Sequence, residues 1–575
     1  MNLSFERIRG DAVAFLDRTR KIGWIDVLVI AGVVGLTLGL VNLAGEWRSP
    51  HVPPKQFDLS PSALPLYTFY SLMRGLLAYV LSLAFTLVYG YWAAKDKLAQ
   101  RLLIPLLDIL QSIPVLGFLP GLVISLNAIF PSNTGLEIAA IIMIFTGQAW
   151  NMTFSFYHSL RSIPGDQREA AAVYRFSPWQ TLKWVELPFS TMGLVWNSMM
   201  SMAGGWFFLM INEAFQLGDN DYRLPGLGSY MSFAQEKDDY AAMAYGVFAM
   251  ILMIVLLDQF FWRPVVVWAQ RFRVEEGGYQ ETMHSWFLEW LQRSKLVGAM
   301  TRTVRNLFSR KESPVARAPA GPNYHSGGLL VARGLFALLL GVLLYGTWQL
   351  VELLKNVPIE EWLSISFAGI VTLGRVLIST ALGTLWALPA GLAIGLSPRL
   401  SRFFQPIVQV AASFPAPMVF PIVVVVMSAI GIDVNWFSIA LMLMGTQWYI
   451  LFNVIAGAMA IPADLKESSR SFNVRGMQRF WVLYAPSVFP YLVTGWVTAA
   501  GGAWNASIVS EYVKTKSREY IATGIGAKIS VATAHANFSV MAASIVVMSA
   551  MVVLFNRLIW RRLYHIAEER YSLNK

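Results

Sequence analysis

Apolar residues run along the chain in twelve long stretches separated by polar segments. Each stretch holds about 20 or more residues with few charges, enough for a helix to cross a hydrocarbon core roughly 30 Å thick. The stretches form two sets of six: 22–45, 66–94, 102–130, 136–160, 186–216 and 240–268, then 329–355, 366–396, 403–431, 435–460, 487–512 and 537–560. Their interruptions by proline, glycine and polar residues favour helices over a membrane barrel. The pattern predicts an all-α polytopic membrane protein.

The second half of the chain repeats the first at a spacing of 298 residues. The copies align without a gap over residues 147–263, where Glu213 matches Glu511. Upstream, Pro114 matches Pro415 at a spacing of 301, so the second copy lacks three residues in between. Because each half has an even number of predicted spans, the copies are expected to be two parallel six-helix repeats around a central pathway.

The repeat and the composition divide the chain into five segments. These are an N-terminal segment with the first span (1–65), a first permease-like unit (66–270), a linker (271–328), an extra span (329–365) and a second unit with a tail (366–575). Aromatic and basic residues between Trp286 and Arg310 recur at helical spacing, which predicts an amphipathic helix on the membrane surface. From Glu312 to Gly328 the composition is that of a flexible tether. The helix is expected to be a connector, with a regulatory role as the alternative.

Composition agrees with a membrane location. Apolar residues make up 56% of the chain, charged residues 14%, and the mean hydropathy is +0.51. The net charge is +11, and most basic residues flank the spans on one side, which predicts that the N- and C-termini are cytoplasmic. The positive charge is expected to meet anionic membrane lipid rather than nucleic acid. The first stretch lacks a small-residue cleavage site and is expected to be a retained span. The chain has no cysteine, and its histidines show no metal-ligand spacing.

One polar segment interrupts the apolar pattern at residues 168–188, with the sequence REAAAVYRFSPWQTLKWVELP. A similar segment, KESSRSFNVRGMQRFWVLYAP, stands at the equivalent place in the second half, residues 466–486. Asp166 with Glu169 predicts a capped first helix, and Ser177 with Gln180 predicts a capped second one. Pro164 and its mate Pro462 are expected to end the preceding spans. A solvated helix pair presented twice on the cytoplasmic side indicates a docking surface.

These segments resemble the signature cytoplasmic loop of ABC import permeases. The residues that occupy the motif positions are Glu169, Ala170, Ala171, Arg175, Val185, Leu187 and Pro188, and in the second copy Glu467, Ser468, Ser469, Asn473, Leu483, Ala485 and Pro486. Arg175 replaces the usual glycine, and Asn473 can adopt the left-handed conformation that the turn requires. The stretches 490–512 and 224–231 are similar to permeases for nitrate, sulfonates, taurine and bicarbonate, which suggests a small anion as the solute.

The resemblance implies that each loop docks on an ATP-hydrolysing subunit. The residues implied in this coupling are Asp166, Glu169, Ala170, Ala171, Arg175, Pro188, Asp464, Glu467, Ser468, Ser469, Asn473 and Pro486. Since no Gly-Lys dipeptide occurs, the chain has no P-loop, and ATP and Mg are expected on two partner ATPase subunits. The resemblance also implies an extracytoplasmic substrate-binding protein and a bacterial-type inner-membrane location.

Polar residues inside spans are candidates for the translocation pathway or for helix–helix hydrogen bonds. They are Gln148, Asn151, Asn197, Asn212 and Glu213, with Gln447, Asn453, Asn505, Ser507, Ser510 and Glu511 in the second half. For an anionic solute, Glu213 and Glu511 are expected to form a structural ion pair or outer gate. The clusters at 203–205 and 501–503 indicate close helix packing or a flexible gate.

Two other functions stay open at this point. A secondary active transporter also has two six-span halves, but it needs no ATPase dock. A membrane enzyme is disfavoured, because no His, Cys or carboxylate cluster has catalytic or metal-ligand spacing.

Overall fold

The structure is a computed structural model. It describes residues 23–49, 57–112, 114–130, 132–217, 220–272, 285–294, 296–298, 341, 344–514 and 518–571. The chain forms two compact units: unit 1 holds Met1–Arg48, Ser162–Trp196 and Val255–Leu329, and unit 2 holds Ser49–Arg161, Asn197–Ile254 and Leu330–Lys575.

Unit 1 contains the described parts of the first span, the first polar loop and the linker. Its helices are α2 (Trp24–Arg48), α7 (Gly165–Val173), α8 (Pro178–Thr181), the start of α9 (Leu187–Glu213), α12 (Arg263–Ala269) and α13 (Trp286–Gln292).

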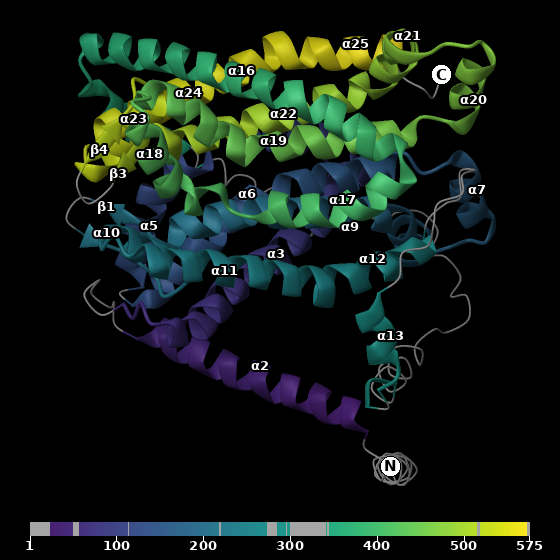
Figure 1. The fold of residues 1–575 in the computed structure, drawn as a ribbon, viewed down its shortest axis with the longest axis horizontal. Coiled ribbons are helices and arrows are strands. Elements are labelled where there is room, and N and C mark those ends of the chain that lie inside the picture. The colour runs from purple at the N-terminus through teal and green to yellow at the C-terminus, as the bar shows by residue number, and fades with distance from the viewer. Residues whose placement is uncertain are drawn as a thin grey trace. The chain divides into compact units, whose positions relative to one another are not determined.

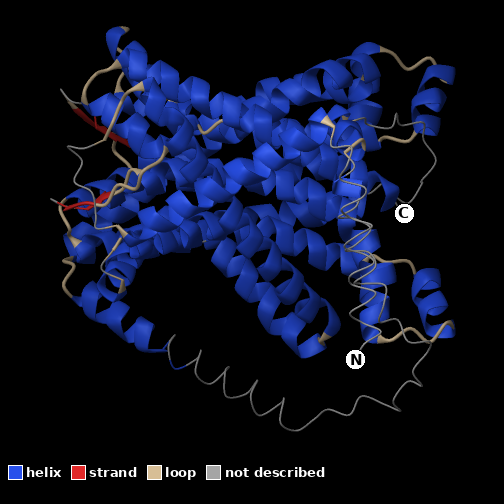
Figure 2. Ribbon diagram, turned by 90° about the horizontal axis from the view of Figure 1, so that it is seen from below, coloured by secondary structure: helices blue, strands red, loops and turns tan. Residues whose placement is uncertain are grey.

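Unit 2 contains most of both repeats (Figures 1 and 2). The first copy supplies α3 (Leu64–Lys95), α4 (Lys97–Ser112), α5 (Leu119–Ile129), α6 (Asn133–Arg161), the rest of α9, α10 (Leu227–Glu236) and most of α11 (Tyr240–Leu257). The second supplies α16 (Ile359–Leu396), α17 (Pro398–Ser413), α18 (Phe420–Ala429), α19 (Val434–Ala460), α20 (Ala463–Ser471), α21 (Gly476–Arg479), α22 (Ala485–Ser510), α23 (Ile525–Ala534), α24 (Phe538–Phe555) and α25 (Arg561–Tyr571).

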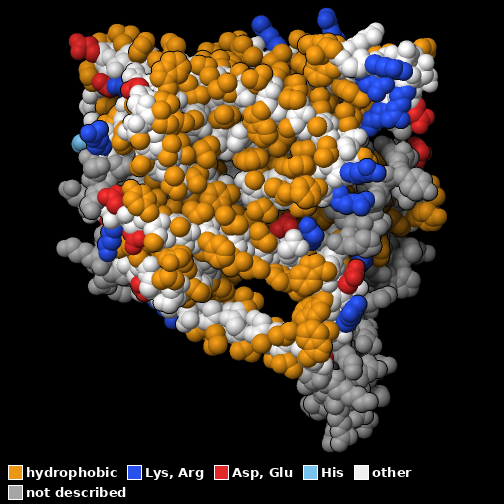
Figure 3. Space-filling model, in the orientation of Figure 1, with side chains coloured by type: hydrophobic (Ala, Val, Ile, Leu, Met, Phe, Trp, Pro, Cys, Tyr) orange, Lys and Arg blue, Asp and Glu red, His pale blue; other side chains and the backbone are white. Residues whose placement is uncertain are grey.

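Two short antiparallel hairpins follow α9 and α22 at equivalent positions. In the first, β1 (Gln216–Leu217) pairs with β2 (Asn220–Asp221); in the second, β3 (Tyr512–Lys514) pairs with β4 (Glu519–Ile521). The hairpins lie at the end of unit 2 opposite α20 (Figure 1). Apolar side chains cover the broad face over α16, α17 and α19, with Lys and Arg gathered toward the α20 end (Figure 3).

The all-α membrane fold is confirmed. Among the described residues, nine helices are long and apolar enough to cross a membrane, and each matches one of the twelve predicted spans. The predicted span 329–355 lies mostly outside the described residues.

The third predicted span of each half is wrong as a continuous helix. In the first copy a 3-10 turn, Val115–Phe118, separates α4 from α5, and in the second Ala416–Met418 separates α17 from α18. The break falls at Pro114 and at Pro415, because a proline disfavours helical geometry in the residue before it and donates no hydrogen bond.

Small residues let the helices of each copy approach closely. A Cβ on Gly391 or Gly395 of α16 would lie 2.6 Å from a side-chain carbon of α19, so a larger residue at either position would force the two helices apart.

The described part of the linker contains one short helix, α13, which packs on protein. The helix α13 covers 286–292, where Phe287 stacks edge-on against Phe260 with ring centroids 4.7 Å apart. The buried Asp26 carboxylate accepts a hydrogen bond of 2.7 Å from Ser294. The remainder of the predicted helix and the tether lie outside the described residues.

Candidate functional site

The first polar loop is a pair of short helices joined by a tight turn. The α7 helix ends in a Schellman motif, in which the Phe176 amide donates to the Ala171 carbonyl at 2.9 Å and the Arg175 amide to the Ala172 carbonyl at 3.0 Å. Arg175 has φ 53°, the left-handed conformation that this motif needs.

The second loop repeats the motif at every equivalent position. The Val474 amide donates to the Ser469 carbonyl and the Asn473 amide to the Arg470 carbonyl, both at 2.9 Å. Asn473 has φ 56°. The predicted turn is confirmed in both copies, although neither uses glycine.

The predicted caps are half right. Ser177 and Gln180 form the expected capping box, with bonds of 3.3 and 2.8 Å. The predicted N-caps Asp166 and Asp464 are wrong. Each first helix begins directly after its proline, which is the N-cap and makes no side-chain bond. Both aspartates therefore lie inside the first turn, where a carboxylate meets the positive end of the helix dipole.

Each loop presents an exposed face. Val173 and Tyr174 are 78% and 73% exposed, and Phe472 is 82% exposed. Glu169 and Glu467 are also exposed, and neither makes an ion pair with any described residue. Within the motif, Ala171 is buried and its mate Ser469 is half-buried, bonding instead to the Lys466 carbonyl at 2.9 Å. Partial burial lowers the pKa of the Lys466 ammonium.

A π-helical turn joins each loop to the span that follows. The turns cover Leu182–Glu186 and Phe480–Tyr484, at the same place in the two copies. Pro188 and Pro486 directly follow these turns, as the second residues of α9 and α22. The second short helix of the loop, the π-helical turn and the span form one helix of 36 residues in the first copy and 35 in the second.

The predicted candidate Glu213 lies in a buried ion cluster of the first copy. Arg74 of α3 contacts Glu213 at 2.5 Å and Glu137 of α6 at 2.6 Å. The Ser71 hydroxyl donates to Glu213 at 2.7 Å. All four side chains are at most 1% exposed.

The second copy builds the same cluster with one change. Arg375 contacts Glu511 at 2.7 Å, and the Thr372 hydroxyl donates to Glu511 at 2.8 Å. At the position of Glu137 stands Asn435, whose side-chain oxygen accepts from Arg375 at 2.6 Å.

Both glutamates hold the start of a short helix. Glu213 accepts from the Gly228 amide at 2.7 Å, and Glu511 accepts from the Gly526 amide at 2.9 Å. A Cβ on Gly226 would overlap the Glu213 carboxylate, and one on Gly524 would overlap that of Glu511. The two glutamates are thus ion-pair anchors of α10 and α23, which favours the structural interpretation over contact with a passing solute.

The three charged members Arg74, Glu137 and Arg375 were missed in the sequence, as were their polar partners, because an isolated charge in an apolar run shows no local pattern. The signal was the repeat itself, since Arg74 and Arg375 stand at the upstream spacing of 301 and both interrupt a predicted span.

The other pathway candidates have varied surroundings. Gln148 accepts from Ser82 at 3.4 Å, Asn197 donates to Ser155 at 2.9 Å, Gln447 accepts from Trp386 at 3.0 Å, Asn453 donates to the Tyr449 carbonyl at 2.8 Å, Ser507 donates to the Trp504 carbonyl at 2.8 Å and Asn505 accepts from the Val115 amide at 2.8 Å. The polar atoms of Asn212 and Ser510, an equivalent pair, are buried without a partner in the described chain. Asn151 is half-buried and makes no side-chain hydrogen bond with the described residues.

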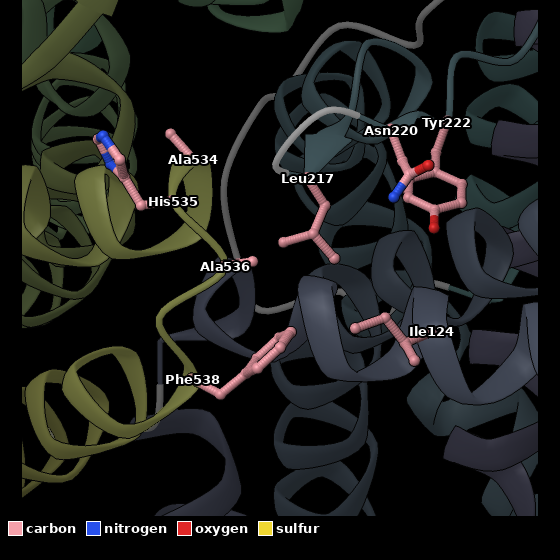
Figure 4. A pocket seen from close by; sticks show the side chains of 8 residues that line it. All are labelled: Ile124, Leu217, Asn220, Tyr222, Ala534, His535, Ala536 and Phe538. Atoms are coloured by element: carbon pink, nitrogen blue, oxygen red, sulfur yellow. The ribbon is translucent and has the colours of Figure 1, made fainter.

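A cavity of about 590 Å³ opens between the two copies at the hairpin end of unit 2. Leu217, Ile124 and Phe538 point into it, whereas His535 points away (Figure 4). Asn220 and Tyr222 are the polar side chains at its edge, and none of the described lining residues is Asp, Glu, Lys or Arg. The described lining is therefore a mixture of apolar and polar side chains.

The repeated loops and spans are those of a transport permease. The chain belongs to the family described as "Binding-protein-dependent transport system inner membrane component", which matches twice, at residues 86–262 and 380–570. The resemblance predicted from the sequence is confirmed, and one chain contains two permease units.

Relatives include "Nitrate import permease protein NrtB" of Synechococcus elongatus and "Bicarbonate transport system permease protein CmpB" of Synechocystis, each 28% identical over 145 residues. "Taurine transport system permease protein TauC" of Escherichia coli is 22% identical over 148 residues. Each match covers 25% of this chain and 50% of the relative. The chain thus spans about half the length of these relatives.

Proposed function

We propose that this chain supplies both permease units of an ATP-driven importer that brings a small anion into the cytoplasm. The observation that carries the proposal is the helix–turn–helix loop built twice with the same Schellman turn, the same exposed glutamate and the same π-helical junction to a span. A loop used only as a connector needs none of these shared features.

Each loop docks on one ATPase subunit, so one chain binds two. The exposed Glu169 and Glu467 meet basic residues of the ATPase, and the apolar side chains beside them enter a cleft. ATP and Mg are bound by those partners. Movement of each loop is carried by the continuous helix into α9 or α22, where the two copies meet.

The solute class is inferred from the relatives. Nitrate and bicarbonate are small oxyanions, and taurine carries a sulfonate. We infer that an extracytoplasmic binding protein delivers the solute at the hairpin end and that both termini are cytoplasmic.

The test is uptake of nitrate, bicarbonate and taurine by vesicles that contain the chain, a cognate ATPase and a cognate substrate-binding protein. Uptake of an anion that requires ATP and both partners supports the proposal. Uptake driven by an ion gradient without the ATPase would favour a secondary transporter instead.

A further inference from the structure

Two contacts between α9 and α19 join the copies within the membrane spans. The Tyr449 hydroxyl lies 3.2 Å from the place that a Cβ on Gly204 would take, and apart from the local chain no other described atom is within 4 Å of that place. The Phe207 ring lies 3.9 Å from the corresponding place on Gly445. Gly204 and Phe207 share one face of α9, and Gly445 and Tyr449 share one face of α19. Two aromatic side chains therefore close this side of the junction.

At the equivalent positions of the repeat, asparagine side chains stand in place of these two aromatic rings. At the spacing of 298 residues, Asn151 is the mate of Tyr449 and Asn505 is the mate of Phe207. Asn505 faces the first copy, since it accepts from the Val115 amide. One turn earlier on the same face of α22, no described atom outside the local chain lies within 4 Å of the Cβ place on Gly501. At Gly502, the mate of Gly204, a ring carbon of Tyr449 lies 3.3 Å from the Cβ place. The face of α22 at Gly501 is therefore open, whereas Tyr449 fills the space between Gly502 and Gly204.

The Tyr449 hydroxyl is suited to meet a solute. The side chain is half-buried, and its hydroxyl makes no hydrogen bond with the described residues. A phenol left without a partner in hydrocarbon is costly, so this position fits a group that faces water or a polar solute. A neutral donor binds an anion without holding it as tightly as a fixed positive charge would, which permits release.

We propose that Tyr449 is the gate residue of the translocation pathway. Its ring packs on Gly502, and its hydroxyl closes the junction by lying against Gly204, where it can donate a hydrogen bond to the passing oxyanion. The proposal rests on the import function proposed above. It divides the glycine cluster into two roles: Gly205 packs against Gln148 of its own copy, whereas Gly204 is the seat for Tyr449.

The cysteine-free chain allows a direct test by thiol labelling. Gly204→Cys places a thiol under Tyr449, and Gly501→Cys places one on the open side. In lipid nanodiscs without ATPase, a membrane-impermeant maleimide should label Gly501→Cys quickly in every background. Gly204→Cys should be labelled slowly, and about tenfold faster when Tyr449→Ala is added. Equal rates with and without the Tyr449 ring would overturn the gate.

A matched control is Tyr491→Ala, because Tyr491 packs on Gly457 within its own copy, with a ring carbon 2.9 Å from the Cβ place. This variant should leave labelling of Gly204→Cys unchanged. If it speeds labelling as much as Tyr449→Ala does, general loosening explains the result and the gate is refuted.

Nitrate uptake, measured without any introduced cysteine, tests the hydroxyl. Tyr449→Phe keeps the ring, so it should speed labelling of Gly204→Cys less than Tyr449→Ala does. It should lower uptake about tenfold, the loss of one hydrogen bond to a charged group. Unchanged uptake in Tyr449→Phe would refute the hydroxyl's role. Protection lost in Tyr449→Ala, with no anion transported by any variant, would leave the gate standing and refute the proposed solute class.

Discussion

The two buried ion clusters perform one task with different charges. In each copy an arginine and a glutamate anchor the short helix that follows a hairpin, and a glycine leaves room for the carboxylate. The third partner differs, since Glu137 in the first copy is replaced by Asn435 in the second. One arginine thus faces two carboxylates in the first cluster and one carboxylate in the second. The anchor needs the arginine–glutamate pair, whereas its third partner needs only an oxygen that accepts from the arginine.

Removing the arginine should give the largest effect and should separate the copies. Arg375→Met leaves one buried carboxylate uncompensated, which typically costs about 3–5 kcal/mol, and Arg74→Met leaves two and should cost more. Either loss is a large share of the free energy of unfolding of a typical domain, so little folded protein is expected. The measurement is the yield and melting temperature of purified protein.

Arg263→Met is the control, because Arg263 is 37% exposed and its ion pair should contribute less than about 1 kcal/mol. Equal losses in Arg74→Met and Arg375→Met would contradict the comparison.

Exchanging the third partner tests the comparison next. Asn435→Asp adds a second, half-buried carboxylate to the second cluster without a new cation, and we expect a loss of about 2 kcal/mol in the free energy of unfolding. Glu137→Gln keeps an acceptor for Arg74 and should change stability by less than about 1 kcal/mol. Thermal unfolding of both variants decides the matter. A larger loss in Glu137→Gln than in Asn435→Asp would mean that the first cluster needs its second charge.

The docking loops invite a parallel comparison, with an effect on binding rather than folding. Glu169→Lys should weaken ATPase binding at least about tenfold and abolish uptake while leaving membrane insertion normal, because it reverses an exposed charge at the proposed contact. Glu467→Lys should do the same less severely, since the second loop has serines where the first has alanines. Pull-down of the ATPase with each variant gives the measurement. Glu360→Lys, an exposed change at the start of α16, is the control. Undiminished ATPase binding and uptake in Glu169→Lys would remove this loop from the mechanism.

The smallest effect is expected at the loop turns. Arg175 has a side chain in a conformation that glycine adopts freely, so Arg175→Gly should stabilise its turn by about 0.5–1 kcal/mol. Asn473→Gly should stabilise its turn by less, because asparagine tolerates the left-handed conformation better than arginine does. Hydrogen exchange of the amides in 165–181 and 463–479 would report the difference. Slower exchange in the asparagine variant than in the arginine variant would reverse the expected order.

The features that could be predicted correctly from the sequence are those that the repeat or a long apolar run makes visible. Spans such as α19 needed only length and hydropathy, and the left-handed turn at Arg175 followed from its alignment with a motif glycine. The break before Pro114 was missed, because hydropathy is averaged over a whole span and does not register a single proline, although that proline breaks the helix locally. The clusters were missed because Arg74 meets Glu137 and Glu213 across 63 and 139 residues, and only the packing of three helices brings those charges together.

The central claim is that one chain carries both docking loops and both permease units. Its most direct test is the mass of the purified complex with its ATPase in nanodiscs, by native mass spectrometry. The account predicts one permease chain with two ATPase subunits, and one ATPase fewer when either loop is replaced by a glycine–serine segment. Two permease chains for each pair of ATPase subunits would contradict it.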